Sequence, residues 1–157
     1  MTKIITSAYI MIGDEILSGR TEDENLNFLA KNLVNVGINL KEVRVIPDDE
    51  VEIIKAIQDL KDKYNYIFTT GGIGPTHDDI TSAAVAKAFN LPLIRDPEAV
   101  ALLRQHYPNI EDLNEQRMKM CEVPEGAILV DNPISKAPGY QIENVFVLAG
   151  VPRIMQA

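Results

Sequence analysis

The sequence predicts an α/β fold in which helices cover both faces of a mostly parallel sheet. Three apolar runs typical of strands, at residues 4–12, 43–46 and 66–70, alternate with segments whose apolar residues have helical spacing. Strands that alternate with helices in this way indicate parallel pairing through right-handed crossovers. The length of 157 residues suits one domain, so we expect residues 1–157 to form a single unit.

The first strand and helix are marked by their ends. Residues 4–12 are apolar up to Gly13, which predicts a strand buried on both faces. The pattern T-x-x-E at residues 21–24 predicts a capping box that begins a helix. Gly37 stands where a glycine would end that helix.

The next elements are again a helix, a strand and a helix. Asp49 and Glu52 form a second helix start, ahead of the short strand at 66–70. An alanine-rich segment at 80–89 predicts a third helix that packs closely because its side chains are small.

The second half of the chain predicts shorter elements. Asp96 and Pro97 begin a helix that runs to about Tyr107, and residues 111–120 predict another. Short strands are predicted at residues 127–130, 140–142 and 145–148. Residues 150–157 have the pattern of a helix that has just begun, so we expect the domain to continue beyond residue 157.

Composition excludes several classes of partner. The chain carries 15 basic and 23 acidic residues, a formal charge of −8, which argues against nucleic-acid binding because phosphate contacts need clustered Lys and Arg. No apolar run reaches the roughly 18 residues of a membrane span, and no signal peptide is evident. A single cysteine, Cys121, excludes an internal disulfide and fits packing in a cytoplasmic protein.

Polar residues follow each of the first three predicted strands. Gly13, Asp14 and Glu15 follow the first, Asp48 follows the second, and the segment 71–81 follows the third. Ligands of open α/β sheets bind beyond the carboxyl ends of the strands. We therefore expect these three segments to converge on one rim of the sheet.

The segment TTGGIGPTHDDIT at residues 69–81 combines glycines with acids. Gly71, Gly72 and Gly74 can bring main-chain N–H groups close to a phosphate. The alternative is a tight strand-to-helix turn with Asp79 as the helix cap. The segment fits neither the P-loop pattern nor the dinucleotide fingerprint.

The neighbouring acids indicate a metal. Asp14, Asp48, Asp78 and Asp79 would repel a phosphate unless a cation intervenes, and Mg²⁺ prefers one or two carboxylates with substrate phosphates and water. Asp48, Asp78 and Asp79 are the predicted metal ligands. Such a site suits phosphoryl or nucleotidyl transfer, or pyrophosphate hydrolysis. His77 is either a general base or phosphate donor, or an exposed loop residue.

Several motifs together resemble a known family. GDEILSGR, IPDD, TTGGIGPTHDDIT, VPEGAILVDNPISKAPGY and FVLAGVPRIM are similar to the molybdopterin-binding domain shared by MoaB, MogA, gephyrin and CinA. The paired aspartates after His77 most resemble the N-terminal domain of the competence-damage protein CinA and its stand-alone relatives. The chain departs from the CinA type at Ala149, where that type commonly has proline.

The resemblance implies a three-layer α/β/α domain that binds the phosphate of a nucleotide or a pterin. In the CinA branch it implies a metal-dependent pyrophosphatase acting on ADP-ribose. In the cofactor branch it implies Mg-dependent adenylylation of molybdopterin, and a binding module without catalysis is the third alternative. It also implies a homo-oligomer, dimer or trimer.

The resemblance assigns residues by position. It makes Asp48 and Asp79 the acidic pair, which with His77 are the candidate catalytic residues. The candidate phosphate- and ligand-binding residues are Gly13, Asp14, Thr70, Gly71, Gly72, Gly74, Pro75, Thr76, Pro138, Gly139, Gly150 and Pro152.

Overall fold

A mostly parallel sheet runs through the molecule. The computed structural model describes residues 3–132, 138–150 and 155. Within these residues the sheet has the strand order β2-β1-β3-β8-β7-β6, and the first four strands are parallel while β7 and β6 are antiparallel. The strands are β1 (Ile5–Ile12), β2 (Ile38–Ile46), β3 (Tyr66–Thr70), β6 (Ile128–Val130), β7 (Gly139–Ile142) and β8 (Val145–Leu148). The mostly parallel α/β sheet predicted from the sequence is confirmed.

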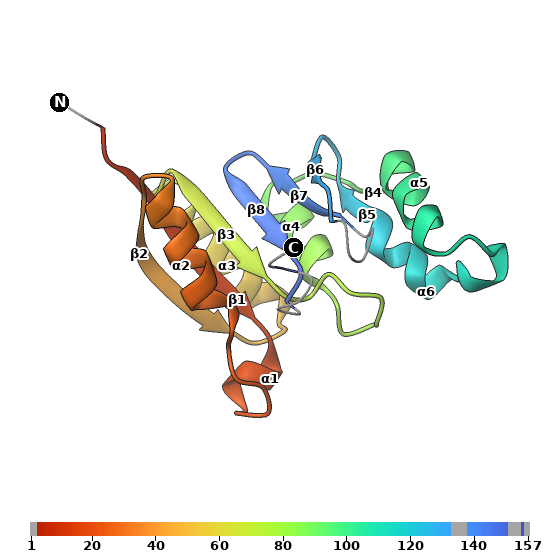
Figure 1. Ribbon diagram of the computed structural model, residues 1–157, viewed down its shortest axis with the longest axis horizontal. Helices are drawn as coiled ribbons and strands as arrows, with labels where there is room; N and C mark the ends of the chain where they lie inside the picture. Colours follow the sequence, from red (N-terminus) through yellow and green to blue (C-terminus); the bar gives the residue numbers. More distant parts are fainter. Residues whose placement is uncertain (1–2, 133–137, 151–154, 156–157) are drawn as a thin grey trace.

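Helices cover both faces of the sheet, which gives the expected three layers. Figure 1 shows α2 (Asn25–Asn35) in front of the strands and α3 (Glu50–Leu60) behind them. Alternate residues of β1 serve the two sides: Tyr9 and Met11 pack with α2, whereas Ile10 and its neighbours pack with α3 and α4 (Thr81–Ala88). The predicted burial of the first strand on both faces is confirmed.

Two predicted helix starts are confirmed by side-chain caps. The Asp49 carboxylate accepts a hydrogen bond of 3.1 Å from the Glu52 N–H at the start of α3. The Asp96 carboxylate accepts bonds of 2.8 and 3.2 Å from Glu98 and Ala99 at the start of α5 (Pro97–His106). Each cap satisfies N–H groups that the first turn of a helix leaves without a partner.

The predicted capping box at residues 21–24 is wrong. Helix α2 begins at Asn25, and the Asp23 carboxylate accepts hydrogen bonds from the N–H groups of Asn25 (3.0 Å) and Leu26 (3.1 Å). Thr21 instead donates its N–H to the Glu15 carbonyl (3.0 Å), closing the turn behind the short helix α1 (Asp14–Leu17). Thr21 therefore belongs to the turn before α2, and Asp23 accepts the hydrogen bonds at the start of the helix.

The predicted helix at 111–120 is also wrong. The segment contains η1 (Ile110–Asp112), α6 (Glu115–Met118) and η2 (Lys119–Cys121). Asn114 interrupts the run, because its side chain accepts the Arg117 N–H (2.8 Å) and so begins a new turn.

A small antiparallel sheet escaped prediction. It pairs β4 (Leu93–Arg95) with β5 (Glu122–Pro124), beside α5 in Figure 1. Three residues a strand are too few to show an alternating pattern. Cys121 lies at its edge, 1% exposed, where burial raises the pKa of the thiol to about 11. This placement fits the packing role expected of the cysteine.

The helices of the described chain are short. The longest, α2 and α3, have eleven residues each. No helix in the described ranges combines the length and the apolar character that a bilayer crossing requires.

Candidate active site at the strand ends

The loops after β1 and β2 are fastened to each other by two aspartates. The Asp14 N–H donates to Asp48 Oδ2 and the Asp48 N–H donates to Asp14 Oδ1, each at 3.1 Å. These reciprocal bonds bring the two strand ends together, as the sequence predicted. Asp14 Oδ2 and Asp48 Oδ1 make no hydrogen bond with any described residue, so each carboxylate keeps one oxygen for a ligand.

Two glycines after β3, Gly71 and Gly72, allow the backbone to turn close to Ile12 and Thr81. Gly71 and Gly72 have φ angles of 99° and 75°, which side chains disfavour. A Cβ at Gly71 would collide with the Ile12 carbonyl oxygen, and one at Gly72 would collide with Thr81 Oγ1. The Gly71 N–H is already bonded to the Leu148 carbonyl at 3.1 Å. Its amide therefore joins β3 to β8 and is not a free donor for a phosphate.

Asp79 closes the loop that follows. Its Oδ2 accepts hydrogen bonds from the Thr76 N–H (2.9 Å) and the Thr76 hydroxyl (2.7 Å). The cap position of α4 is occupied by Ile80, without a side-chain cap. The alternative in which Asp79 caps the helix is therefore wrong, and Asp79 Oδ1 makes no hydrogen bond with the described residues.

An open cavity of about 380 Å³ lies between these loops. We call it the rim cavity. Its described lining comes from all three strand ends: Ile12, Asp14, Glu15, Arg20, Asp48, Gly72, Thr76, His77, Asp78, Asp79 and Ile80. Five carboxylates thus face one guanidinium and one imidazole, so the cavity is strongly acidic.

The crowding of acids raises the pKa of Asp48. Burial is the largest cause, because it disfavours the charged carboxylate, and the charges of Asp14, Glu15 and Asp79 add to it. The hydrogen bond from the Asp14 N–H acts in the opposite direction. A cation bound among these groups would offset both effects.

The acids of the rim cavity suit a cation only if phosphate and water supply most of its ligands. No three acid, histidine or cysteine side chains in the described chain form a ready cage for a metal, so the predicted trio of Asp48, Asp78 and Asp79 is not assembled. Mg²⁺ needs only one or two carboxylates when phosphate and water supply the rest. The open oxygens of Asp48 and Asp79, with Asp14 beside them, suit that arrangement.

His77 and Asp78 lie on the open side of the cavity. Their side chains are 94% and 80% exposed, and His77 Nε2 is 3.3 Å from Asp78 Oδ1. Neither is held in place by the protein core. The structure thus matches the exposed-loop alternative for His77, although both residues remain within the lining of the cavity.

Thr70 and Gly150 belong to a second, smaller cavity. It has a volume of about 40 Å³ and lies on the α2 side of the strand ends. Thr70 Oγ1 shares a hydrogen bond of 2.6 Å with the Tyr9 hydroxyl, and the Gly150 carbonyl accepts one of 2.9 Å from Asn25 Nδ2. These predicted ligand residues therefore line the smaller cavity and not the rim cavity, although the two cavities share Ile12 and Glu15.

The other predicted ligand residues support the loops. The Gly13 N–H donates to the Ile46 carbonyl (3.0 Å), and Pro75 lies in the turn before Thr76. Pro138 and Gly139 are buried at the start of β7, beside the end of β8, and line neither cavity. Pro152 lies outside the described residues.

Three residues of the site were not predicted. Arg20 lines the rim cavity, and its place in the GDEILSGR motif was a usable signal. Lys119 donates its ammonium to the Thr76 carbonyl (2.6 Å) across 43 positions of sequence, and Asn25 reaches Gly150 across 125. Local sequence patterns cannot predict contacts between residues so far apart in the sequence.

Comparison with known proteins identifies relatives over nearly the whole chain. Residues 8–157 match the family model described as a probable molybdopterin binding domain. A protein from Pyrobaculum calidifontis is 36% identical over 97% of this chain and 60% of its own length. A CinA-like protein from Sulfurihydrogenibium is 34% identical over 94% of this chain and 38% of its own. The chain therefore spans about 60%, or less, of the length of these curated relatives.

Solved structures give the same grouping. The crystal structure of CinA from Thermoplasma acidophilum superposes with a TM-score of 0.88 at 33% identity, covering 96% of this chain and 91% of that one. MoaB from Pyrococcus furiosus, a tungsten cofactor synthesizing protein, superposes with a TM-score of 0.61 at 19% identity, covering 99% and 88%. At that identity the second likeness shows the fold alone.

Proposed function

The chain belongs to the molybdopterin-binding domain family, as a CinA-like member, and from this premise we propose that it is a metal-dependent pyrophosphohydrolase for ADP-ribose-like nucleotides. The substrate would enter the rim cavity with its diphosphate toward the carboxylates and a divalent cation, Mg²⁺ by preference, between them. Hydrolysis adds water across the P–O–P link and yields AMP and ribose 5-phosphate.

One observation carries the proposal. Asp14 and Asp48, each held by the other's N–H, and Asp79, held by Thr76, present carboxylates from separate strand ends to the same cavity. A surface with this excess of negative charge would repel a bare diphosphate. It suits a diphosphate that is already complexed with a divalent cation.

The lining residues of the rim cavity would have different roles in binding the cation and the phosphate. Asp48 and Asp79 would hold the cation through their open oxygens, and their bonds to Asp14 and Thr76 keep both carboxylates oriented. Arg20, the one Lys or Arg among the described lining residues, is placed to contact phosphate oxygens. The bound cation would supply charge stabilisation for the leaving phosphate. His77, at the open side, could exchange a proton with water.

The direct test is incubation with ADP-ribose and Mg²⁺, Mn²⁺ or Co²⁺, with chromatographic detection of AMP. We expect metal-dependent AMP formation that Asp79→Asn abolishes, because the amide oxygen can still accept the Thr76 bonds while the charge is lost. Asp62→Asn is the matched control, since its carboxylate is 85% exposed outside the cavity. Absence of AMP with every metal would refute the hydrolase proposal.

A second candidate is binding of molybdopterin through its phosphate, with or without adenylyl transfer. The description of the matching family model favours it. Complementation of a strain that lacks the adenylyltransferase would support transfer. Tight binding of AMP or ADP-ribose with no product, unaltered in Asp79→Asn, would instead identify a binding module.

A further inference from the structure

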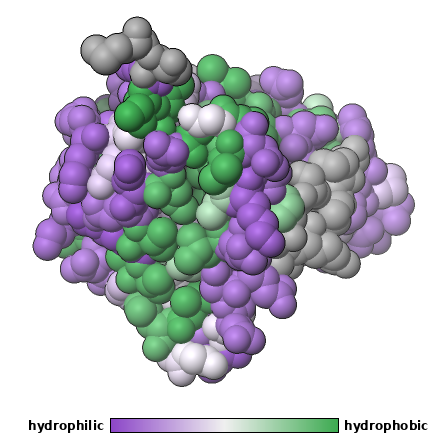
Figure 2. Space-filling view, turned by 60° about the vertical axis from the view of Figure 1, so that its left-hand side comes forward, coloured by the Kyte–Doolittle hydropathy of each residue, from purple (hydrophilic) through white to green (hydrophobic). Residues whose placement is uncertain are grey.

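The loop that carries Asp79 contains no helix or strand and has little apolar cover. It covers residues 74–79, between β3 and α4, and the side chains of Thr76, His77 and Asp78 are exposed. Exposed apolar side chains gather elsewhere, in the hydrophobic band that Figure 2 shows on the side of β2 and α2. Polar contacts therefore decide where this loop lies, and with it the carboxylate of Asp79.

Thr76 and Asp79 close the loop on itself. The Asp79 carboxylate accepts the Thr76 N–H and hydroxyl, and the Thr76 carbonyl accepts the Asp79 N–H at 3.2 Å. These bonds fix the carboxylate relative to Thr76, but they do not join the turn to the rest of the molecule. A turn closed only on itself can move as a unit, so a contact from outside is needed to fix it.

Lys119 supplies that contact. Its Nζ donates to the Thr76 carbonyl at 2.6 Å. Among the described residues, no other hydrogen bond or ion pair joins residues 74–79 to the chain outside them. A charged donor makes this bond stronger than one between neutral groups.

The backbone that carries Lys119 is itself anchored. Lys119 begins η2, and the Cys121 carbonyl at the end of η2 accepts the Asp96 N–H at 2.9 Å. The Cys121 side chain is 1% exposed and packs with Ala99 and Leu103 of α5. The ammonium of Lys119 therefore extends to the loop from a fixed base.

Lys119 reaches the loop from outside the rim cavity. It lines a neighbouring cavity of about 110 Å³, which shares Gly72, Asp79 and Ile80 with the rim cavity. Lys119 is absent from the described lining of the rim cavity, where the cation and the diphosphate would bind. Its place thus suits a residue that holds Asp79 in position better than one that contacts the substrate.

We propose that Lys119 is a positioning residue for Asp79, and that it acts through the Thr76 carbonyl. The inference rests on the proposed function, in which Asp79 holds a divalent cation. Lys119 fixes the turn at Thr76, and the turn fixes the direction of Asp79 Oδ1. The cation then meets Asp79 and Asp48 together, without first ordering the loop. Removal of a group that orients a metal ligand typically costs about 10- to 100-fold in metal affinity or activity.

Amide hydrogen exchange of the metal-free chain, followed by NMR, tests this role without catalysis. Lys119→Met keeps an aliphatic side chain and removes the donor. We expect the Asp79 amide, which is bonded to the Thr76 carbonyl, to exchange about fivefold faster in this variant. Lys31→Met, at an exposed position of α2, removes the same charge and should leave the exchange unchanged. Equal exchange in Lys119→Met and the unmodified chain would overturn the proposal.

Metal activation separates positioning from contact with the substrate. We expect Lys119→Met to need about tenfold more Mn²⁺ for half-maximal AMP formation, and to keep its kcat and its KM for ADP-ribose once Mn²⁺ is saturating. Lys119→Arg, which still carries a charged donor, should restore the metal requirement of the unmodified chain. A raised KM with an unchanged metal requirement would make Lys119 a phosphate ligand and exclude the positioning role.

Mn²⁺ binding in the presence of AMP, measured by electron paramagnetic resonance, keeps this inference separate from the hydrolase proposal. Absence of AMP formation from ADP-ribose would refute the reaction, whereas Lys119→Met should still bind Mn²⁺ about tenfold more weakly than the unmodified chain. In an Asp79→Asn background the same substitution should cause no further loss. A further loss there, equal affinities in Lys119→Met and the unmodified chain, or no Mn²⁺ binding to the unmodified chain would each contradict the role of Lys119.

Discussion

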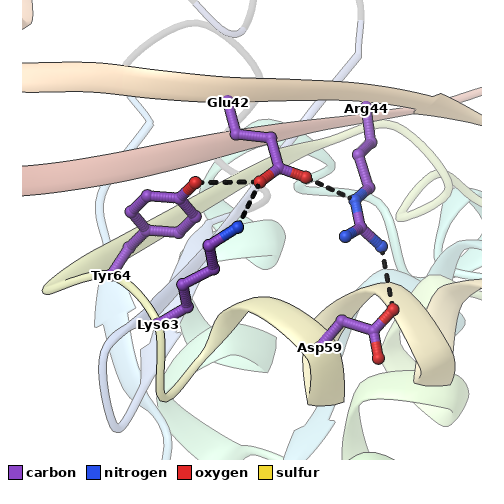
Figure 3. Close-up of polar contacts among 5 residues, drawn as sticks. All are labelled: Glu42, Arg44, Asp59, Lys63 and Tyr64. Atoms are coloured by element: carbon purple, nitrogen blue, oxygen red, sulfur yellow. Dashed lines mark hydrogen bonds and ion pairs between the residues drawn. The ribbon is translucent and has the colours of Figure 1, made fainter.

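One acidic side chain on β2, Glu42, and one just after its end, Asp48, lie in opposite electrostatic surroundings. The groups around Glu42 stabilise its charged form, whereas those around Asp48 disfavour it. On strand β2, in the group of Glu42, Arg44, Asp59, Lys63 and Tyr64 that we call the edge network (Figure 3), Glu42 is bonded to Arg44, Tyr64 and Lys63, and these hydrogen bonds lower its pKa to about 2. At the rim cavity, burial and neighbouring carboxylates raise the pKa of Asp48. The edge network has the character of a stabilising structural element. The rim retains an electrostatic cost that a bound cation would relieve.

The largest effect that tests this contrast is on activity. We expect Asp48→Asn to lower AMP formation by roughly 10²-fold or more, because the cation loses a charged ligand. Its free energy of unfolding without metal should stay equal or rise, since the substitution removes repulsion from Asp14, Glu15 and Asp79. Parallel assays of turnover and urea unfolding measure both. Loss of activity through unfolding would mean that Asp48 is structural.

The edge network should respond in the opposite way. We expect Glu42→Gln to lower the free energy of unfolding by about 1–2 kcal/mol, because three donors lose a charged acceptor at a partly exposed position. Activity per folded molecule should not change. Glu125→Gln, at an exposed position in the turn after β5, serves as the control in urea titrations. An unaltered unfolding midpoint for Glu42→Gln would show that the network contributes nothing measurable.

The pH dependence of stability sharpens the comparison. The folded-state pKa of Glu42 lies below its ordinary value of 4.5, so its contribution is present above about pH 4.5 and is lost as pH falls toward 2. We expect unfolding midpoints of the unmodified chain to decline through that window more steeply than those of Glu42→Gln. Thermal scans from pH 6 to 2 follow the difference between the two proteins. Parallel curves would contradict the assigned shift.

The smallest expected effect is that of metal on the rim. At a Mg²⁺ concentration about ten times its Kd, binding to the folded state should add about 1.4 kcal/mol, a rise in Tm of about 3–6 °C. Asp48→Asn should lose most of this rise, while Glu42→Gln should keep it. Calorimetric scans with Mg²⁺, and with Na⁺ at matched ionic strength, separate binding from screening. An equal rise in both variants would place the metal elsewhere.

Local sequence patterns succeeded where one residue acts on its near neighbours. The caps at Asp49 and Asp96 were predicted as they stand, because hydrogen bonds within a few residues decide them. The short strand at residues 66–70 was also predicted as it stands, although its hydrogen bonds are to the distant strands β1 and β8, because its residue types favour a strand. The same reasoning failed at residues 21–24. There Thr21 bonds back to Glu15, and the competing turn of α1 was not recognised.

The acidic character of the site and its position at the strand ends were determined by the sequence, since parallel strands bring their carboxyl ends to one edge. Only the tertiary structure decided the role of each acid. The bonds that orient Asp14 against Asp48 and Lys119 against Thr76 join residues 34 and 43 positions apart. The surroundings of Asp48 and Glu42 likewise depend on groups that are distant in the sequence. Both are carboxylic acids six positions apart, yet the fold raises the pKa of Asp48 and lowers that of Glu42.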